Sequence, residues 1–218
     1  MPPMKTADDD VEVQNRDPEI AELSALYGAP ARRQCILKVS HATYDLWTRI
    51  QPRRRGEVVL FICRTSGHLI LHTKDFYPAG TLRVPSGSIK KREELVDAAQ
   101  REAREETGLE VDIERFLAVI DFVFQYQEHS RHFQSHLFLL RETGGELKAK
   151  DEREHISAFV EILPIELTSV AESLENMPPA WRDWGLFRAF PHRVAAELLP
   201  ESGESESWPG PSVVPGTQ

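Results

Sequence analysis

The order of apolar and polar positions along the chain predicts a mixture of strands and helices. Alternating or continuous apolar runs predict strands at residues 34–39, 57–63, 68–72, 81–84, 111–127, 131–141 and 156–163. Apolar positions at helical spacing predict helices at residues 19–26, 44–50, 93–107 and 179–199, with a further helix opening near residue 164. Turns are expected at residues 66–67, 78–80 and 144–145. This mixture predicts the α/β class, with a sheet between helices.

The predicted helix at residues 93–107 carries acidic residues on its apolar side. At about 100° per residue, its apolar arc is formed by Leu95, Val96, Ala98, Ala99 and Ala103. Glu102 and Glu106 project into this arc, and Glu105 lies at its edge. Burying an acid is costly unless it is paired or binds a cation. A charged surface helix is the alternative, but that would place the acids opposite the alanines.

The residue types around this helix suit a divalent cation. Mg²⁺ prefers oxygen ligands, and carboxylates three and four residues apart on a helix are neighbours. Gly87 permits a tight loop before the helix, and Gly108 suits a left-handed C-cap after it. The pattern therefore predicts a strand, a glycine loop, a helix with inward-facing acids and a glycine that ends the helix.

Residues 87–109 resemble the signature of the Nudix hydrolase family. The matching positions are Gly87, Glu93, Arg101, Glu102, Ala103, Glu105, Glu106, Gly108 and Leu109. The resemblance implies a Nudix-like α/β/α sandwich with a mixed β-sheet. It also implies a hydrolase that uses Mg²⁺ or Mn²⁺ to cleave a diphosphate linkage in a nucleoside diphosphate linked to another moiety. The alternative is a non-catalytic nucleotide-sensing or interaction domain, which the loss of signature acids would favour; none is lost.

The resemblance also implies residue roles. Glu102, Glu105 and Glu106 would coordinate the metal, and Arg101 and Glu93 would hold the loop and helix together. The residue before the signature glycine often donates a backbone carbonyl to the metal; here it is Ser86, where glycine is commoner. A further acid from a later loop often serves as base or extra ligand. Glu154 is the candidate here, with Asp151 and Glu152 as competitors, so the identity of the general base stays open.

Basic and aromatic residues near the signature are candidates for binding a nucleotide-type substrate. Arg83 and Lys90 could hold distal phosphates, although a solvated surface charge is the alternative for each. Tyr126 lies 17 residues past Leu109, and no proline occurs between Leu109 and Pro164. Within the family this resembles dinucleoside-polyphosphate hydrolases more than ADP-ribose pyrophosphatases. Tyr126 could equally belong to the core.

Charge and composition divide the chain into three parts. Residues 1–30 hold seven acids against two bases, and residues 200–218 hold three acids and no base, out of a net charge of −9. We expect both segments to be disordered, with residues 31–199 forming one Nudix domain and its C-terminal helix. Bulk binding of nucleic acid is not expected. No secretory signal or membrane-spanning run is present, which favours a cytoplasmic protein. The aromatic C-terminal helix most simply packs on the core; a homodimer interface is the alternative.

Overall fold

The computed structural model describes residues 18–50, 55–149 and 152–199. Its helices are α2 (Pro18–Tyr27), α3 (His41–Ile50), α4 (Leu95–Thr107), α5 (Leu167–Glu175) and α6 (Arg182–Leu198), with short 3₁₀ turns η2 (Glu152–Glu154), η3 (Pro164–Glu166) and η4 (Pro179–Trp181). Its strands are β1 (Ala31–Lys38), β2 (Gly56–Cys63), β3 (Leu69–Lys74), β4 (Ser86–Ile89), β5 (Leu109–Tyr126), β6 (His129–Gly145) and β7 (Ile156–Ile162). No helix in these described ranges is long and apolar enough to cross a membrane.

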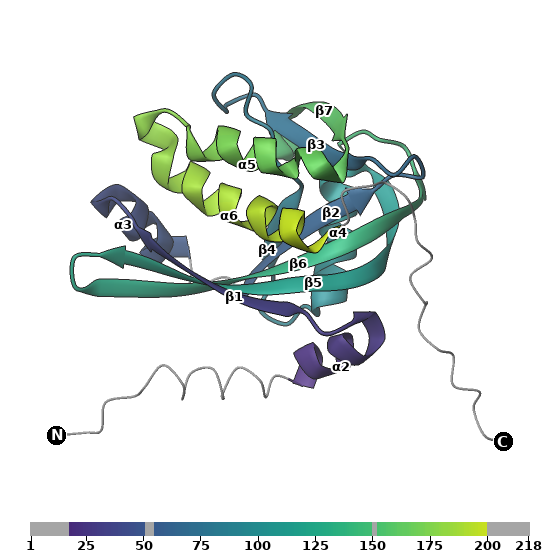
Figure 1. Cartoon of the computed structure of the whole chain (residues 1–218), viewed down its shortest axis with the longest axis horizontal. Coiled ribbons are helices and arrows are strands. Elements are labelled where there is room, and N and C mark those ends of the chain that lie inside the picture. Colours follow the sequence, from purple (N-terminus) through teal and green to yellow (C-terminus); the bar gives the residue numbers. More distant parts are fainter. Residues whose placement is uncertain (1–17, 51–54, 150–151, 200–218) are drawn as a thin grey trace.

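The strands form one mixed sheet in the order β1-β5-β6-β2-β3-β7, with β4 paired to β2. The β1–β5 and β2–β6 pairs are parallel, and the other pairs are antiparallel. Strands β5 and β6 form a long hairpin that crosses the molecule (Figure 1). The mixed sheet confirms the expected topology class.

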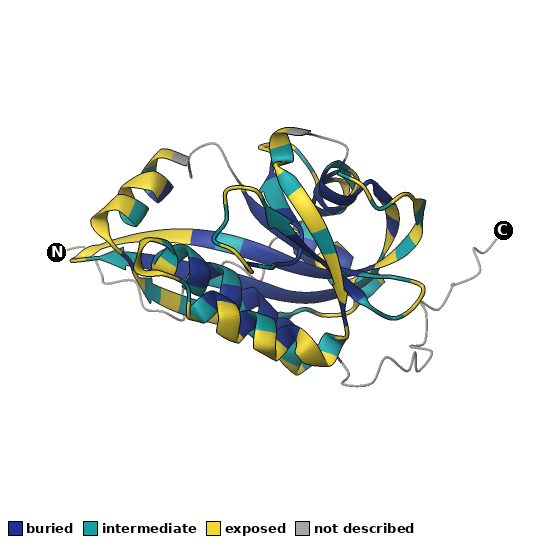
Figure 2. Cartoon of the chain, turned by 90° about the horizontal axis from the view of Figure 1, so that it is seen from above, coloured by how far each residue is buried: buried dark blue, intermediate teal, exposed yellow. Residues whose placement is uncertain are grey.

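Two apolar layers cover the two faces of the sheet. On one face, Trp47 of α3 and Phe187 of α6 pack with Phe61 and Phe122 of the strands. On the other face, α2 and α4 pack against the alternate strand residues, including Leu60 and Phe138. Figure 2 shows the buried positions following the strands and the inner sides of the helices. The α/β/α sandwich is therefore confirmed.

The sheet is split next to β4. Strands β2 and β3 pair only at Cys63↔Leu69. Beyond that point the segment from residue 83 to 89 lies between them: the Leu60 amide donates to the Pro85 carbonyl at 2.9 Å, and the His72 amide donates to the Arg83 carbonyl at 2.9 Å. This split brings β4 against the second half of α4, where Gly87 lies beside Glu102 and the Ser86 amide donates to Glu106.

Four predicted elements differ from the structure. The expected glycine loop is strand β4, and residues 81–84 contribute only a single bridge between His72 and Arg83. The expected turn at residues 144–145 continues β6, because Gly145 pairs with Leu109. The C-terminal helix begins at Arg182 after η4, since the proline-rich start forms a 3₁₀ turn.

The segment at residues 1–30, expected to be disordered, contains an ordered helix. Residues 18–27 form α2, close to the short helix predicted at 19–26, and Ile20 and Leu23 are buried against the α4 layer. Apolar packing in the layer shared with β5 and α4 supplies the stabilisation that the acidic composition did not reveal. Residues 1–17 and 200–218, for which disorder was predicted, lie outside the described residues.

Candidate functional site

Helix α4 places its three signature acids at the split in the sheet. Leu95, Ala99 and Ala103 are fully buried and set the inward face of the helix. Glu102 and Glu106 share that face and are 7% and 1% exposed, whereas the Glu105 side chain is 42% exposed. The helix ends at Gly108, which has φ 75° and a left-handed C-cap conformation. The arrangement follows directly from helical periodicity.

Glu106 is the most deeply buried of these acids and has three partners. The Ser86 amide donates to its Oε2 at 2.8 Å. Lys74 Nζ and Arg83 Nη2 lie 3.2 and 3.5 Å from its Oε1. Burial still raises the pKa of the Glu106 carboxyl above its usual value, against the opposing effect of Arg83 and Lys74.

Glu102 lies directly beneath the backbone of Gly87. A Cβ added at Gly87 would fall 1.8 Å from the Glu102 carboxyl carbon. Gly87 lies within strand β4, so its missing side chain allows the close approach of Glu102 and does not serve a turn. Burial raises the pKa of the Glu102 carboxyl to about 7, although the adjacent Arg101 lowers it.

Arg101 ties the helix to the preceding segment. Its Nε and Nη2 donate to the two oxygens of Glu93 at 2.6 and 2.8 Å, and Nη2 also donates to the Ser88 carbonyl at 3.0 Å. Its Nη1 contacts Glu102 at 2.7 Å and Glu105 at 3.0 Å. This single guanidinium therefore orients two of the signature acids and the strand beside them.

Glu154 reaches the same cluster from the turn before β7. Lys74 Nζ donates to Glu154 Oε2 at 2.8 Å while also contacting Glu106, so Lys74 bridges the two carboxylates. Of the competing acids, Asp151 and the side chain of Glu152 lie outside the described residues. The fold thus brings Glu154 to the signature helix across about fifty residues of sequence.

The donor set fits a hard divalent cation in its chemistry. Glu102, Glu105 and Glu106 offer carboxylate oxygens, and burial disfavours the charged forms of Glu102 and Glu106, so added positive charge would stabilise them. Within the described ranges no three acidic, histidine or cysteine side chains already converge on one point. Lys74, Arg83 and Arg101 instead neutralise these acids. A divalent cation bound here would take over part of this charge compensation.

Of the predicted substrate-binding residues, Arg83 is buried and Lys90 is exposed. Arg83 is 4% exposed and donates to Tyr77 Oη at 2.9 Å and Ser86 Oγ at 3.0 Å, besides contacting Glu106. Its guanidinium is therefore engaged inside the protein, because the strand pair at His72 turns it inward. The Lys90 side chain is exposed, and its amide donates to Glu93 Oε2 at 2.9 Å.

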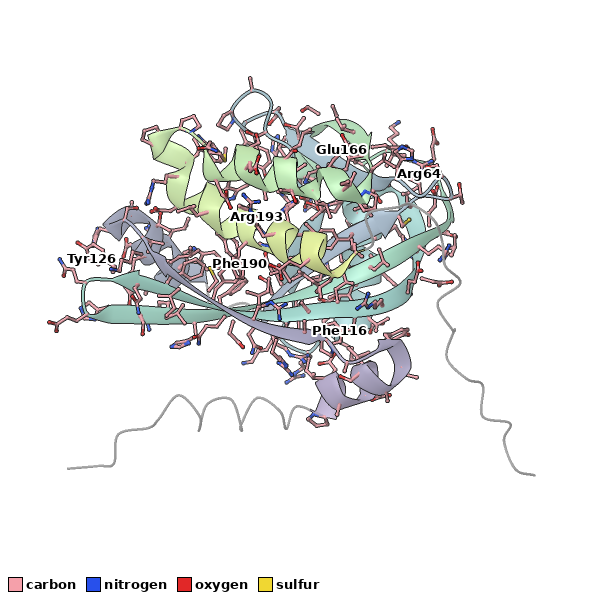
Figure 3. All side chains as sticks on the ribbon, in the orientation of Figure 1. Arg64, Phe116, Tyr126, Glu166, Phe190 and Arg193 are labelled. Carbon is pink, nitrogen blue, oxygen red and sulfur yellow. The ribbon has the colours of Figure 1, made fainter. Side chains whose placement is uncertain are left out.

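Tyr126 is not brought to the acids. It lies at the tip of the β5–β6 hairpin (Figure 3), paired with His129, whereas the end of β5 that follows α4 is at Leu109. Its ring contacts His41 and Tyr44 of α3 at centroid distances of 5.2 and 6.0 Å.

Two residues at the site were not anticipated from the sequence. Lys74 ends β3 in a stretch with no motif, so only the pairing of β3 with its neighbours reveals its position. His72, two residues earlier, is fully buried, and neither ring nitrogen has a hydrogen-bond partner. Burial holds the pKa of His72 well below 6.5, aided by Arg83 and Lys74, so the ring is neutral.

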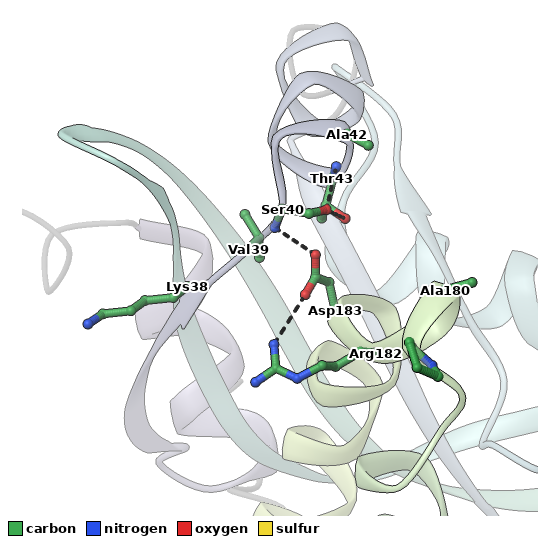
Figure 4. Close-up of a pocket in the computed structure, with 9 residues that line it drawn as sticks. Lys38, Val39, Ser40, Ala42, Thr43, Ala180, Arg182 and Asp183 are labelled. Atoms are coloured by element: carbon green, nitrogen blue, oxygen red, sulfur yellow. Dashed lines mark hydrogen bonds and ion pairs between the residues drawn. The ribbon is translucent and has the colours of Figure 1, made fainter.

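A surface cleft of about 620 Å³ lies apart from these acids, between the end of β1 and the start of α6 (Figure 4). It is lined by Lys38, Val39, Ser40, Ala42, Thr43, Pro179, Ala180, Arg182 and Asp183. Asp183 accepts the Ser40 amide at 2.8 Å and lies 3.6 Å from Arg182. None of the signature residues lines it, so the acid cluster, not this cleft, is the candidate site.

A family model matches most of the chain. The family model described as NUDIX domain matches residues 52–204. Among solved structures, an ADP-ribose pyrophosphatase from Streptococcus suis is similar at a TM-score of 0.42 and 20% sequence identity, covering 70% of this chain and 93% of that chain. No curated protein sequence matches.

Proposed function

Because this chain belongs to the Nudix family of pyrophosphohydrolases, we propose that it cleaves a diphosphate linkage in a nucleoside diphosphate linked to another moiety, with Mg²⁺ as cofactor. The observation that carries the proposal is the pair of buried acids on α4, Glu102 and Glu106, held beside the glycine strand β4. Burying carboxylates is costly even where cationic side chains pair with them, and a metal-binding role accounts for their position beside β4.

We assign the metal-binding role to Glu102, Glu105 and Glu106, with the Ser86 carbonyl as a further candidate ligand. A divalent cation bound there would neutralise charge on the diphosphate and lower the pKa of a bound water. Arg101 holds Glu102 and Glu105 in position, and the Ser86 amide holds Glu106.

Glu154 is the candidate general base. It is partly exposed, at 29% for the side chain, so it can reach a substrate water while contacting Lys74. Lys74 sits between Glu154 and Glu106 and keeps the base close to the helix acids. A carboxylate in this position could accept the proton of the attacking water.

Product analysis with a substrate panel tests the function. The panel contains dinucleoside polyphosphates, ADP-ribose, nucleotide sugars, NADH, coenzyme A and nucleoside triphosphates, each with Mg²⁺. We expect one class to be cleaved between two phosphorus atoms.

Glu106→Gln should lower turnover by at least about 100-fold while leaving the fold intact, as judged by circular dichroism. The matched control is Asp97→Asn, an exposed acid on the same helix, which should keep full activity. Full activity in Glu106→Gln would refute the metal-ligand role of this residue.

A further inference from the structure

The helix before the family domain contacts the signature helix through the Glu19 side chain and a shared apolar layer. Helix α2 lies outside residues 52–204, the range of the family match. Its Ile20 and Leu23 are buried in the same apolar layer as Leu95 and Ala98 of α4. This packing holds Glu19 over the first turn of α4.

The first turn of α4 is not capped by the side chain of its N-cap residue. The N-cap residue Glu94 makes no side-chain capping hydrogen bond. The Leu95 amide donates instead to Glu19 Oε1 at 2.5 Å, across 76 residues of sequence. Leu95 is fully buried, so water is a poor substitute for this acceptor. A carboxylate at a helix N-terminus also interacts favourably with the helix dipole.

Arg55 joins the same contact to the rest of the site. It forms an ion pair with Glu19, and its Nη1 donates to the Glu93 carbonyl at 2.9 Å. The Glu93 carboxylate in turn holds Arg101, which orients Glu102 and Glu105. A continuous series of polar contacts therefore runs from α2 to two of the candidate metal ligands.

We infer that Glu19 is a positioning residue, which sets the start of α4 and, through Arg55, Glu93 and Arg101, the placement of Glu102 and Glu105. The inference rests on the proposed function for the metal-binding role of these acids. Helix α2 would then help to position the metal-binding acids, although it lies outside the matched family domain.

Two measurements on the full chain without substrate test this inference. Glu19→Ala should speed hydrogen exchange of the first-turn amides of α4 by about fivefold, because the cap is lost. It should also raise the dissociation constant for Mn²⁺, measured by calorimetry, by about threefold or more. Glu22→Ala, an exposed acid on the same helix, should change neither quantity. Glu19→Gln keeps an acceptor for the Leu95 amide without the charge, and should fall between the wild type and Glu19→Ala.

The outcomes separate positioning from simple stabilisation. Faster exchange with unchanged Mn²⁺ affinity would overturn the inference, because Glu19 would then only stabilise the helix. Unchanged exchange in Glu19→Ala would overturn it as well. If Glu19→Ala does not fold, the same comparison is decided with Glu19→Gln. A wild-type chain without Mn²⁺ affinity would refute the proposed function along with this inference, whereas a wild type that binds Mn²⁺ confines any failure to Glu19.

Discussion

Individual residues at this site are constrained by close contact and by charge. Gly87 leaves room for the Glu102 carboxylate, and Lys74 neutralises Glu106 and Glu154 together. Neither role can be recognised from residue type alone. A glycine is compatible with many turns, and a lysine is usually a solvated surface charge.

Gly87→Ala tests the close approach of β4 to the acids. The added Cβ would overlap the Glu102 carboxyl carbon at 1.8 Å, so the carboxylate or the strand must move. We expect Mg²⁺-dependent turnover to be lost because the Glu102 carboxylate is displaced. Stability, measured by urea unfolding, should fall by about 1 kcal/mol, because this carboxylate is buried and held by Arg101 and cannot swing freely into solvent.

Gly144→Ala is the matched control for this substitution. Its Cβ would meet only the flexible end of Glu110, at 3.3 Å, so it should be nearly neutral. Wild-type turnover in Gly87→Ala would contradict the overlap.

Lys74→Met tests the internal counter-charge. The Lys74 side chain is 9% exposed and contacts two carboxylates, so its removal leaves Glu106 with one fewer buried partner. We expect the metal-free chain to lose about 3 kcal/mol of stability. Added Mg²⁺ should then raise the melting temperature more than in the wild type, because the cation replaces the missing charge. Equal metal-free melting temperatures would show that Lys74 has no such role.

At the scale of elements, helix packing depends on contacts that no local pattern shows. Helices α5 and α6 lie side by side over one face of the sheet (Figure 1). Gly185 of α6 approaches the Leu174 carbonyl of α5 closely, and a Cβ there would lie 2.2 Å from that oxygen. The two helices therefore meet at a small residue.

Gly185→Ala should separate these two helices. The overlap is with backbone and not with a flexible side chain, so α5 must shift, at a cost of about 2 kcal/mol. Thermal unfolding measures this loss, and Gly144→Ala again serves as the control. Turnover should persist at permissive temperature, since Gly185 makes no contact with the acid cluster. A melting temperature equal to that of the control would contradict the predicted packing.

At the scale of the whole molecule, α6 is joined to the split in the sheet by one buried histidine. His192 Nδ1 donates to the Arg188 carbonyl at 2.8 Å, and its Nε2 accepts the Val84 amide at 3.2 Å. Burial lowers the pKa of His192 from 6.5 to about 4, so the ring stays neutral in the folded state. Protonation would remove the acceptor for Val84.

We expect the buried His192 to make the protein less stable in acid. The unfolded chain binds a proton near pH 6.5 and the folded chain only near pH 4. The contribution of neutral His192 to the free energy of unfolding is therefore fully present above pH 6.5. It decreases by about 3 kcal/mol as the pH falls toward 4. His192→Gln retains an acceptor and cannot titrate. Its urea midpoint should fall less than that of the wild type between pH 7.5 and 4.5. Equal falls in both would show that His192 does not titrate in this range.

The sequence by itself determined the properties that depend on local spacing. Helical periodicity placed Glu102 and Glu106 on the inner side of α4, and alternation located most strands of the mixed sheet. The left-handed C-cap at Gly108 also follows from residue type and position. These features need only neighbours within a few residues, so the pattern of side chains is enough to predict them.

Only the tertiary structure decided which distant residues meet. The split between β2 and β3 brings Lys74 and Glu154 to Glu106, and the docking of α2 brings Glu19 to Leu95. The pairing of β5 with β6 places Tyr126 at the tip of their hairpin, away from the acids. Such contacts depend on strand order, register and long-range apolar packing, and a single chain carries no local signal for them.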